Sequence, residues 1–103
     1  MVAEAKNKKG KTKRLKGNPL LIAVCRSVHE RREQLGISQE ELAHRAGLHR
    51  TYISDIERGA RNPSLKTLSR LADALELATS DLIKRGENKA KALENSHEGG
   101  SPN

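Results

Sequence analysis

Residues 36–59 constrain the fold more than any other stretch of this 103-residue chain. Ser38 is a suitable N-terminal cap for a helix, and Glu41 three residues later completes the capping-box pattern. Gly47 comes two turns further on, and glycine ends helices because it adopts the left-handed backbone at no steric cost. The stretch therefore begins with a short helix that ends at Gly47.

A second short helix follows this glycine turn. His49 is a possible cap, and Gly59 is the stop. Between them Ile53 and Ile56 repeat three residues apart, which places both on one inward face. At about 100° per residue the polar positions turn outward, with Arg50 on the flank nearest the helix start: Thr51, Ser54, Asp55 and Arg58. Two short helices joined by a glycine turn have the spacing of a helix-turn-helix unit.

Helix signals flank this unit on both sides. Asn18 followed by Pro19 predicts a helix start, and apolar spacing continues that helix to Gly36. On the other side Ser64 is a cap, and the residues after it trace one apolar helical stripe: Leu65, Leu68, Leu71, Ala72 and Leu75. Both flanking helices are therefore expected to hold the central unit in place.

A fifth helix is predicted to be short, over about residues 79–84, with Leu82 and Ile83 facing inward. From residue 85 onward glycine, serine, proline and balanced charge are typical of a flexible tail. Residues 18–84 are therefore expected to form the domain, and residues 85–103 the tail. Because no strand-like alternation or internal repeat occurs in the chain, the predicted fold class is all-α, with five helices.

The net charge of +7 belongs mostly to residues 1–17. This segment has one acidic residue and is too polar to bury enough surface to offset the entropy of ordering. We therefore predict a disordered basic arm that attracts a polyanion, while the rest of the chain is nearly neutral. Its basic residues are Lys6, Lys8, Lys9, Lys11, Lys13, Arg14 and Lys16.

The composition disfavours several classes of protein. No apolar run is long enough for a membrane span or a secretory signal, so a cytoplasmic location is expected. The single cysteine, Cys25, is expected to fill the core, and an exposed redox thiol is the less favoured alternative. No catalytic motif occurs, and the histidines do not form a metal-ligand spacing with Cys25: His29, His44, His49 and His97. We therefore expect no metal, no cofactor and no enzymatic activity.

Several short motifs occur in the order and spacing of one family: residues 39–43, Gly47, residues 53–54 and 56–59, Asn62-Pro63 and Leu75. On these residues the chain resembles the phage repressor and Cro superfamily of helix-turn-helix proteins, the xenobiotic-response-element type. Residues 50–54 and 57–62 also resemble the controller regulators of restriction-modification systems. The resemblance implies a compact five-helix bundle of the lambda-repressor-like type, with disordered termini. It also implies a sequence-specific, double-stranded DNA-binding transcriptional regulator such as a repressor.

The family places the second helix of the unit in the major groove, so the resemblance implies this for residues 50–58. It assigns base reading to Arg50, Thr51 and Asp55, with Ser54 at the margin. The chemistry agrees, because the Arg50 guanidinium matches guanine O6 and N7, and Thr51 suits a base edge or a thymine methyl. Asp55 is suited to accept from cytosine or to orient Arg50.

The resemblance also implies contacts to the DNA backbone, with the Gln39 amide on a phosphate at the start of the first helix. Further backbone contacts are implied for Ser38, His49, Arg58 and Arg61. For Ser38 the alternative is a purely capping role, and Tyr52 is either half-buried or bonded to a phosphate through its hydroxyl. Arg32 and Glu57 occupy the positions of an internal ion pair in this family.

A homodimer on a palindromic operator is expected, because half-sites about 34 Å apart place two reading helices on one face of the duplex. The resemblance places the interface at the end of the fourth helix, around Leu77, and on the fifth helix. Two other functions stay open. One is a protein-binding module, such as an antitoxin or a coactivator, with a toxin or RNA polymerase as partner. The other is a weakly specific nucleoid-associated or membrane-surface binder that uses the basic arm.

Overall fold

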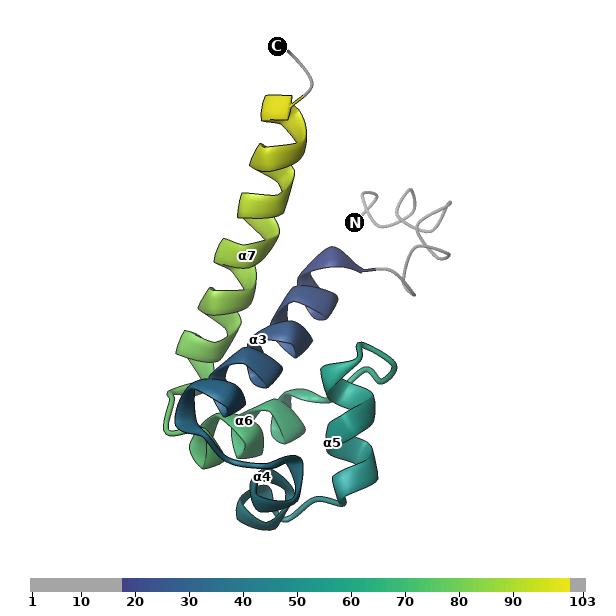
Figure 1. The fold of residues 1–103 in the computed structure, drawn as a ribbon, viewed down its shortest axis with the longest axis vertical. Coiled ribbons are helices and arrows are strands. Elements are labelled where there is room, and N and C mark those ends of the chain that lie inside the picture. Colours follow the sequence, from purple (N-terminus) through teal and green to yellow (C-terminus); the bar gives the residue numbers. More distant parts are fainter. Residues whose placement is uncertain (1–17, 101–103) are drawn as a thin grey trace, which may run out of the picture.

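The computed structural model describes the backbone of residues 18–100 and the side chains of residues 18–93. The predicted basic arm, residues 1–17, lies outside this part of the chain. Five helices follow one another without a strand over the described residues (Figure 1): α3 (Pro19–Leu35), α4 (Gln39–Ala46), α5 (Arg50–Glu57), α6 (Leu65–Ala74) and α7 (Thr79–Gly100). The predicted all-α, five-helix fold is confirmed.

The helix boundaries arise from the predicted caps. Each cap side chain accepts a hydrogen bond from a first-turn N–H: Asn18 from Leu21, Ser38 from Glu41 and Ser64 from Thr67. Gly36 and Gly47 end α3 and α4 with φ angles of 69° and 70°, where a side chain would be strained. His49 precedes α5 but makes no side-chain capping bond.

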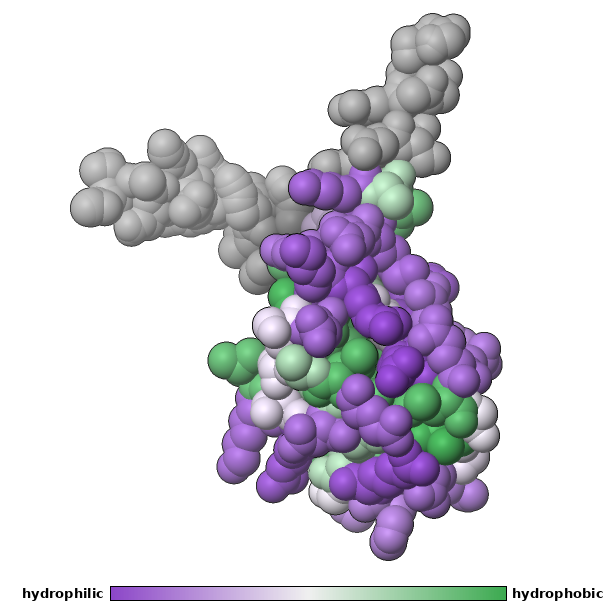
Figure 2. All heavy atoms as spheres, turned by 90° about the vertical axis from the view of Figure 1, so that its left-hand side faces the viewer, coloured by the Kyte–Doolittle hydropathy of each residue, from purple (hydrophilic) through white to green (hydrophobic). Residues whose placement is uncertain are grey.

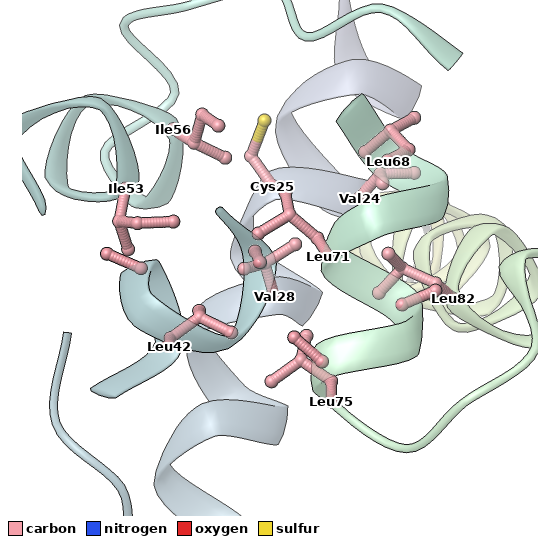
Figure 3. Packing of buried hydrophobic residues seen from close by; sticks show 14 residues of the cluster. Val24, Cys25, Val28, Leu42, Ile53, Ile56, Leu68, Leu71, Leu75 and Leu82 are labelled. Atoms are coloured by element: carbon pink, nitrogen blue, oxygen red, sulfur yellow. The ribbon is translucent and has the colours of Figure 1, made fainter. Parts of the chain in front are cut away.

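The core lies where all five helices meet (Figure 3). Ile53 and Ile56 are fully buried there, as their spacing predicts. Cys25 is also fully buried, which confirms its role as a core residue, and burial raises the pKa of its thiol to about 11. Leu65 was predicted in the core but is 67% exposed. It is the first residue of α6, and helical side chains tilt toward the N-terminus, so it points past the helix end.

The fifth helix is much longer than predicted, because α7 continues to Gly100 instead of ending near residue 84. In the sequence, Gly86 suggests that the helix ends there. In the structure Gly86 is buried against α3, where a Cβ would lie 2.9 Å from the Val24 Cα. Beyond it, Lys89 Nζ lies 2.8 Å from Glu30 Oε2. Packing on α3 therefore supports α7 as far as Lys89, within the residues that were expected to form a flexible tail (Figure 1).

The surface beside α7 is mainly hydrophilic, with small separate hydrophobic patches (Figure 2). Leu20 and Ile22, near the start of α3, are 40% and 38% exposed. Among the described residues, no helix has both the length and the apolar character needed to cross a membrane.

Candidate nucleic-acid interface

The helix α5 has one buried face and one accessible polar face. Ile53 and Ile56 anchor its inner face in the core. Arg50 and Thr51, at its first two positions, are exposed, whereas Ser54 and Asp55 are half-buried. The helix therefore presents polar side chains outward from a firmly packed base, and its first turn is the most accessible part.

Asp55 organises the cations at the far end of α5. Its carboxylate pairs with Arg58, and its Oδ2 lies 3.5 Å from the Nε of Arg61. In the structure the partners of the Asp55 carboxylate are thus Arg58 and Arg61, and not Arg50. Arg61 makes a second contact, because its guanidinium lies over the ring of Tyr52, 5.1 Å from the ring centroid. Asp55 thus holds two exposed arginines on the same surface as the polar face of α5.

A hollow of about 480 Å³ lies beside the first turn of α5. It is lined by Gly47, Leu48, His49, Thr51, Tyr52 and Arg61. Tyr52 is half-buried and packs against the core. Half-burial is one of the two alternatives that the sequence leaves open for this residue. The fold brings together three side chains predicted to bind phosphates, His49, Tyr52 and Arg61, around one concave surface.

The start of α4 supplies two further predicted contacts. Ser38 is exposed and its Oγ caps the helix by accepting from the N–H of Glu41. Gln39 is half-buried, and its Nε2 donates to Glu57 Oε1 at 3.0 Å. The sequence predicted the place of Gln39 at the helix start but not this internal bond.

Glu57 is the buried centre of a polar cluster that joins α3, α4 and α5. The predicted pair with Arg32 is formed, with Arg32 Nε 2.7 Å from Glu57 Oε2 and Arg32 Nη2 3.1 Å from Oε1. His29 Nδ1 lies 2.9 Å from the same Oε1. The side chains of Glu57 and Arg32 are only 4% and 11% exposed. We call Glu57, Arg32, His29 and Gln39 the Glu57 cluster.

Burial alone would raise the pKa of Glu57, but hydrogen bonds from Arg32, His29 and Gln39 outweigh it, so the pKa is lowered. The hydrogen bond to Glu57 raises the pKa of Arg32 despite partial burial. Arg32 also donates from Nη1 to the Ile37 carbonyl at 2.8 Å, before α4 begins. The charged pair therefore fixes the position of α5 relative to the first two helices.

Sequence reasoning missed His29 as a member of this cluster. A signal was available, because His29 precedes Arg32 by three residues and so lies on the same face of its helix. It also missed Arg31 and Arg45, which donate to the C-terminal carbonyls of α6 at 2.9 Å and 3.4 Å. The last carbonyls of a helix have no partner within the helix, so donors for them are expected. The spacing of residues along the sequence does not identify which side chains supply these donors.

Within the described residues, no group of three or more His, Cys, Asp or Glu side chains is arranged to hold a metal ion. The chemistry of this surface is instead that of hydrogen-bond donors and guanidinium groups around a protruding helix. Such a surface is suited to phosphates and to the edges of bases.

Comparison with known proteins gives the same assignment. The family described as Helix-turn-helix matches residues 28–82. Control protein C.BamHI of Bacillus amyloliquefaciens is 53% identical over 47 residues, which are 46% of this chain and 58% of that protein. The immunity repressor protein of Bacillus phage phi105 is 42% identical over 62 residues, 60% of this chain and 43% of that protein. The chain thus spans about half the length of these relatives.

A solved structure of the restriction-modification controller protein C.Esp1396I, described as a tetramer in complex with its natural 35 base-pair operator, has the same fold. It aligns with a TM-score of 0.67 at 33% identity and covers 71% of this chain and 96% of that one. Both resemblances predicted from the motifs, to phage repressors and to controller proteins, are confirmed. The chain therefore belongs to the helix-turn-helix family of DNA-binding transcriptional regulators, a family of non-enzymatic proteins.

Proposed function

We propose that this chain is a sequence-specific, double-stranded DNA-binding transcriptional regulator that places α5 in the major groove of its operator. The accessible polar face of α5, anchored by the buried Ile53 and Ile56, is the observation that carries the proposal. The major groove is about 12 Å wide and admits one α-helix. A rigidly packed helix is suited to reading bases because its side chains keep one register on the duplex.

Base reading is assigned to the exposed side of α5. Arg50 and Thr51 lie at its start, where recognition helices approach the bases most closely. Ser54 and Asp55 follow one turn later and are less accessible. The Asp55 carboxylate is also paired with Arg58 and Arg61, so it sets the placement of these two backbone-contacting side chains as well.

Backbone contacts are assigned to the rim around this helix: Ser38, Gln39, His49, Tyr52, Arg58 and Arg61. The hollow at the start of α5 has the concave shape needed to receive one edge of the DNA backbone. Backbone contacts of this kind set the position of a protein on the duplex, so that α5 enters the groove at a defined angle. The basic arm adds sequence-independent attraction to the same phosphates.

The regulator is proposed to act as a homodimer on a palindromic operator, with the interface around the end of α6 and the start of α7. The oligomeric state described for C.Esp1396I on its operator supports this assembly. Leu77 is half-buried in this region, and Ile83 borders a hollow of about 290 Å³ together with Leu20. A second copy of this chain that presents the same surface would bury Leu77 and Ile83. The proposed location is the cytoplasm, on the nucleoid, where the operator is.

Selection of bound sequences from a random duplex library tests the proposed function. A palindromic consensus is expected, and absence of any enrichment would refute sequence-specific binding. Replacing Arg50 by alanine should then weaken binding by roughly 1–3 kcal/mol and relax the preference at one base position per half-site, measured by titration against single-base variants. Equal weakening on every sequence would show that Arg50 contacts a phosphate instead.

A further inference from the structure

The helices α3 and α7 approach each other closely at Gly86. This glycine is buried, and a Cβ placed on it would lie 2.9 Å from both the Cα and the backbone N of Val24, and closer still to the Val24 side chain. Two carbon atoms in ordinary contact are about 3.5–4.0 Å apart. Only glycine therefore fits at this position while the two helix backbones keep their present distance.

Two neighbouring contacts hold α7 on either side of Gly86. Leu82, one turn earlier, is fully buried in the core and anchors the start of the helix. Lys89, about one turn later, has its Nζ 2.8 Å from Glu30 Oε2 on α3. Because Gly86 lies between these two contacts, its distance from Val24 sets how α7 is inclined to α3.

A side chain at position 86 would change this inclination. Bringing a Cβ from 2.9 Å to ordinary contact requires the two helices to separate there by about 0.6 Å or more. Gly86 comes four residues after Leu82. With Leu82 held in the core about 6 Å away along the helix, that displacement inclines α7 by about 6°.

The helix α3 connects this contact to α5. Its Arg32 Nε lies 2.7 Å from Glu57 Oε2, and its His29 Nδ1 lies 2.9 Å from Glu57 Oε1. Ile22, near the start of α3, lies next to Gly59 in the turn that follows α5. The helices α5 and α7 are thus both held on one continuous helix (Figure 1). A change in the inclination of α7 on α3 therefore changes its orientation relative to α5.

In the proposed homodimer, Leu77 and Ile83 around the start of α7 lie in the interface, and α5 enters the major groove. The connection from one α5 to the other then runs through α3 and α7 of both copies. Each base pair added between two half-sites moves one of them by about 3.4 Å and rotates it about the duplex axis by roughly 34°. The two copies of α5 therefore fit half-sites of only one spacing, which the inclination of α7 determines.

We propose that Gly86 is a positioning residue whose close contact with Val24 sets the orientation of α7 on α3 and, through it, the spacing between the two half-sites that the dimer binds. This inference rests on the proposed function. It adds a determinant of specificity that is buried and lies outside the proposed DNA-binding surface. The side chains of α5 select the sequence of a half-site, and the α3–α7 contact selects the distance between half-sites.

The test uses the full chain and the half-site found by selection from the random library. It compares a duplex with one half-site and duplexes with two inverted half-sites whose spacers differ by one base pair. Wild-type protein is expected to prefer one spacer. Gly86→Ala should bind the single half-site as wild type does, because α5 is unchanged. On the preferred spacer it should bind about tenfold more weakly, the loss expected when one base contact no longer forms, and its spacer preference should shift or broaden.

Asn88→Ala is the matched control, because it also places an alanine in α7 but at an exposed position. It should keep both the affinity and the spacer preference of the wild type. Dimer formation by each variant is measured by analytical ultracentrifugation. A weaker Gly86→Ala dimer that keeps the wild-type spacer preference would show a merely structural role and overturn the inference.

Two further outcomes would also overturn the inference. One is a wild-type protein that binds all spacers equally. The other is equal weakening of Gly86→Ala on single and paired half-sites, because α5 itself would then be displaced. Absence of any enriched half-site in the selection would instead refute the proposed function.

A charge exchange tests the same helix contact if Gly86→Ala does not fold, as judged by circular dichroism. Lys89→Glu places two carboxylates opposite each other, which repel, so it should also shift or broaden the spacer preference. Adding Glu30→Lys restores the attraction and the wild-type net charge, so the wild-type preference should return. An unchanged preference in Lys89→Glu, or a change that the exchange does not reverse, would contradict the inference.

Discussion

The two carboxylates near the end of α5, Glu57 and Asp55, are both paired with arginines but in opposite settings. Glu57 is 4% exposed, bonds Arg32 at 2.7 Å and joins three helices. Asp55 is 21% exposed, and its partners Arg58 and Arg61 are 61% and 56% exposed. The two residues are two positions apart on α5, which separates their side chains by about 200° around the helix axis. Glu57 therefore faces the interior and Asp55 faces the surface. The buried pair positions α5, whereas Asp55 holds two exposed arginines on the surface that is proposed to meet DNA.

Breaking the buried pair should have the largest effect. Arg32→Ala leaves the Glu57 carboxylate buried without its main partner, which costs about 3–5 kcal/mol of unfolding free energy. Urea denaturation monitored by circular dichroism measures the loss. Arg58→Ala is the matched control on the exposed side, and it should change stability by less than about 1 kcal/mol. Similar losses for the two variants would show that burial does not distinguish the pairs.

Acid should weaken the Glu57 cluster next. The folded pKa of Glu57 is lowered, so the cluster stabilises the fold above the unfolded carboxyl value of about 4.3, and this stability is lost as the pH falls through the folded pKa. The free energy of unfolding, measured in urea series below pH 5, should therefore fall more steeply for wild type than for Glu57→Gln. An equally steep fall in both would mean that other carboxylates dominate the acid response.

Removing the half-buried Asp55 carboxylate should have the smallest effect on stability. Asp55→Asn is expected to cost less than about 1 kcal/mol, because its partners Arg58 and Arg61 are exposed and solvent screens both pairs. Its effect should appear in DNA binding instead, as a changed preference at the base assigned to Asp55, measured against single-base operator variants. A loss of stability comparable to that of Arg32→Ala would overturn the contrast between the two carboxylates.

The helix boundaries of the central unit were predictable because capping is a local interaction. Ser38 bonds the third residue after it, and Gly47 needs only its own backbone freedom. The inward direction of Ile53 and Ile56 also follows from helical periodicity alone. By contrast, the extent of α7 depends on Val24, which is 62 positions before Gly86 in the chain and next to it in space.

The sequence by itself determined an all-α chain, a helix at residues 50–57 with a polar outer face, and the pairing of Arg32 with Glu57 through family resemblance. Only the tertiary structure decided which side chains share a partner: Asp55 with Arg61, and Gln39 and His29 with one oxygen of Glu57. The physical reason is that capping and periodicity act within a few residues. Buried hydrogen bonds depend on how separate helices are packed, and spacing along the chain does not encode that arrangement.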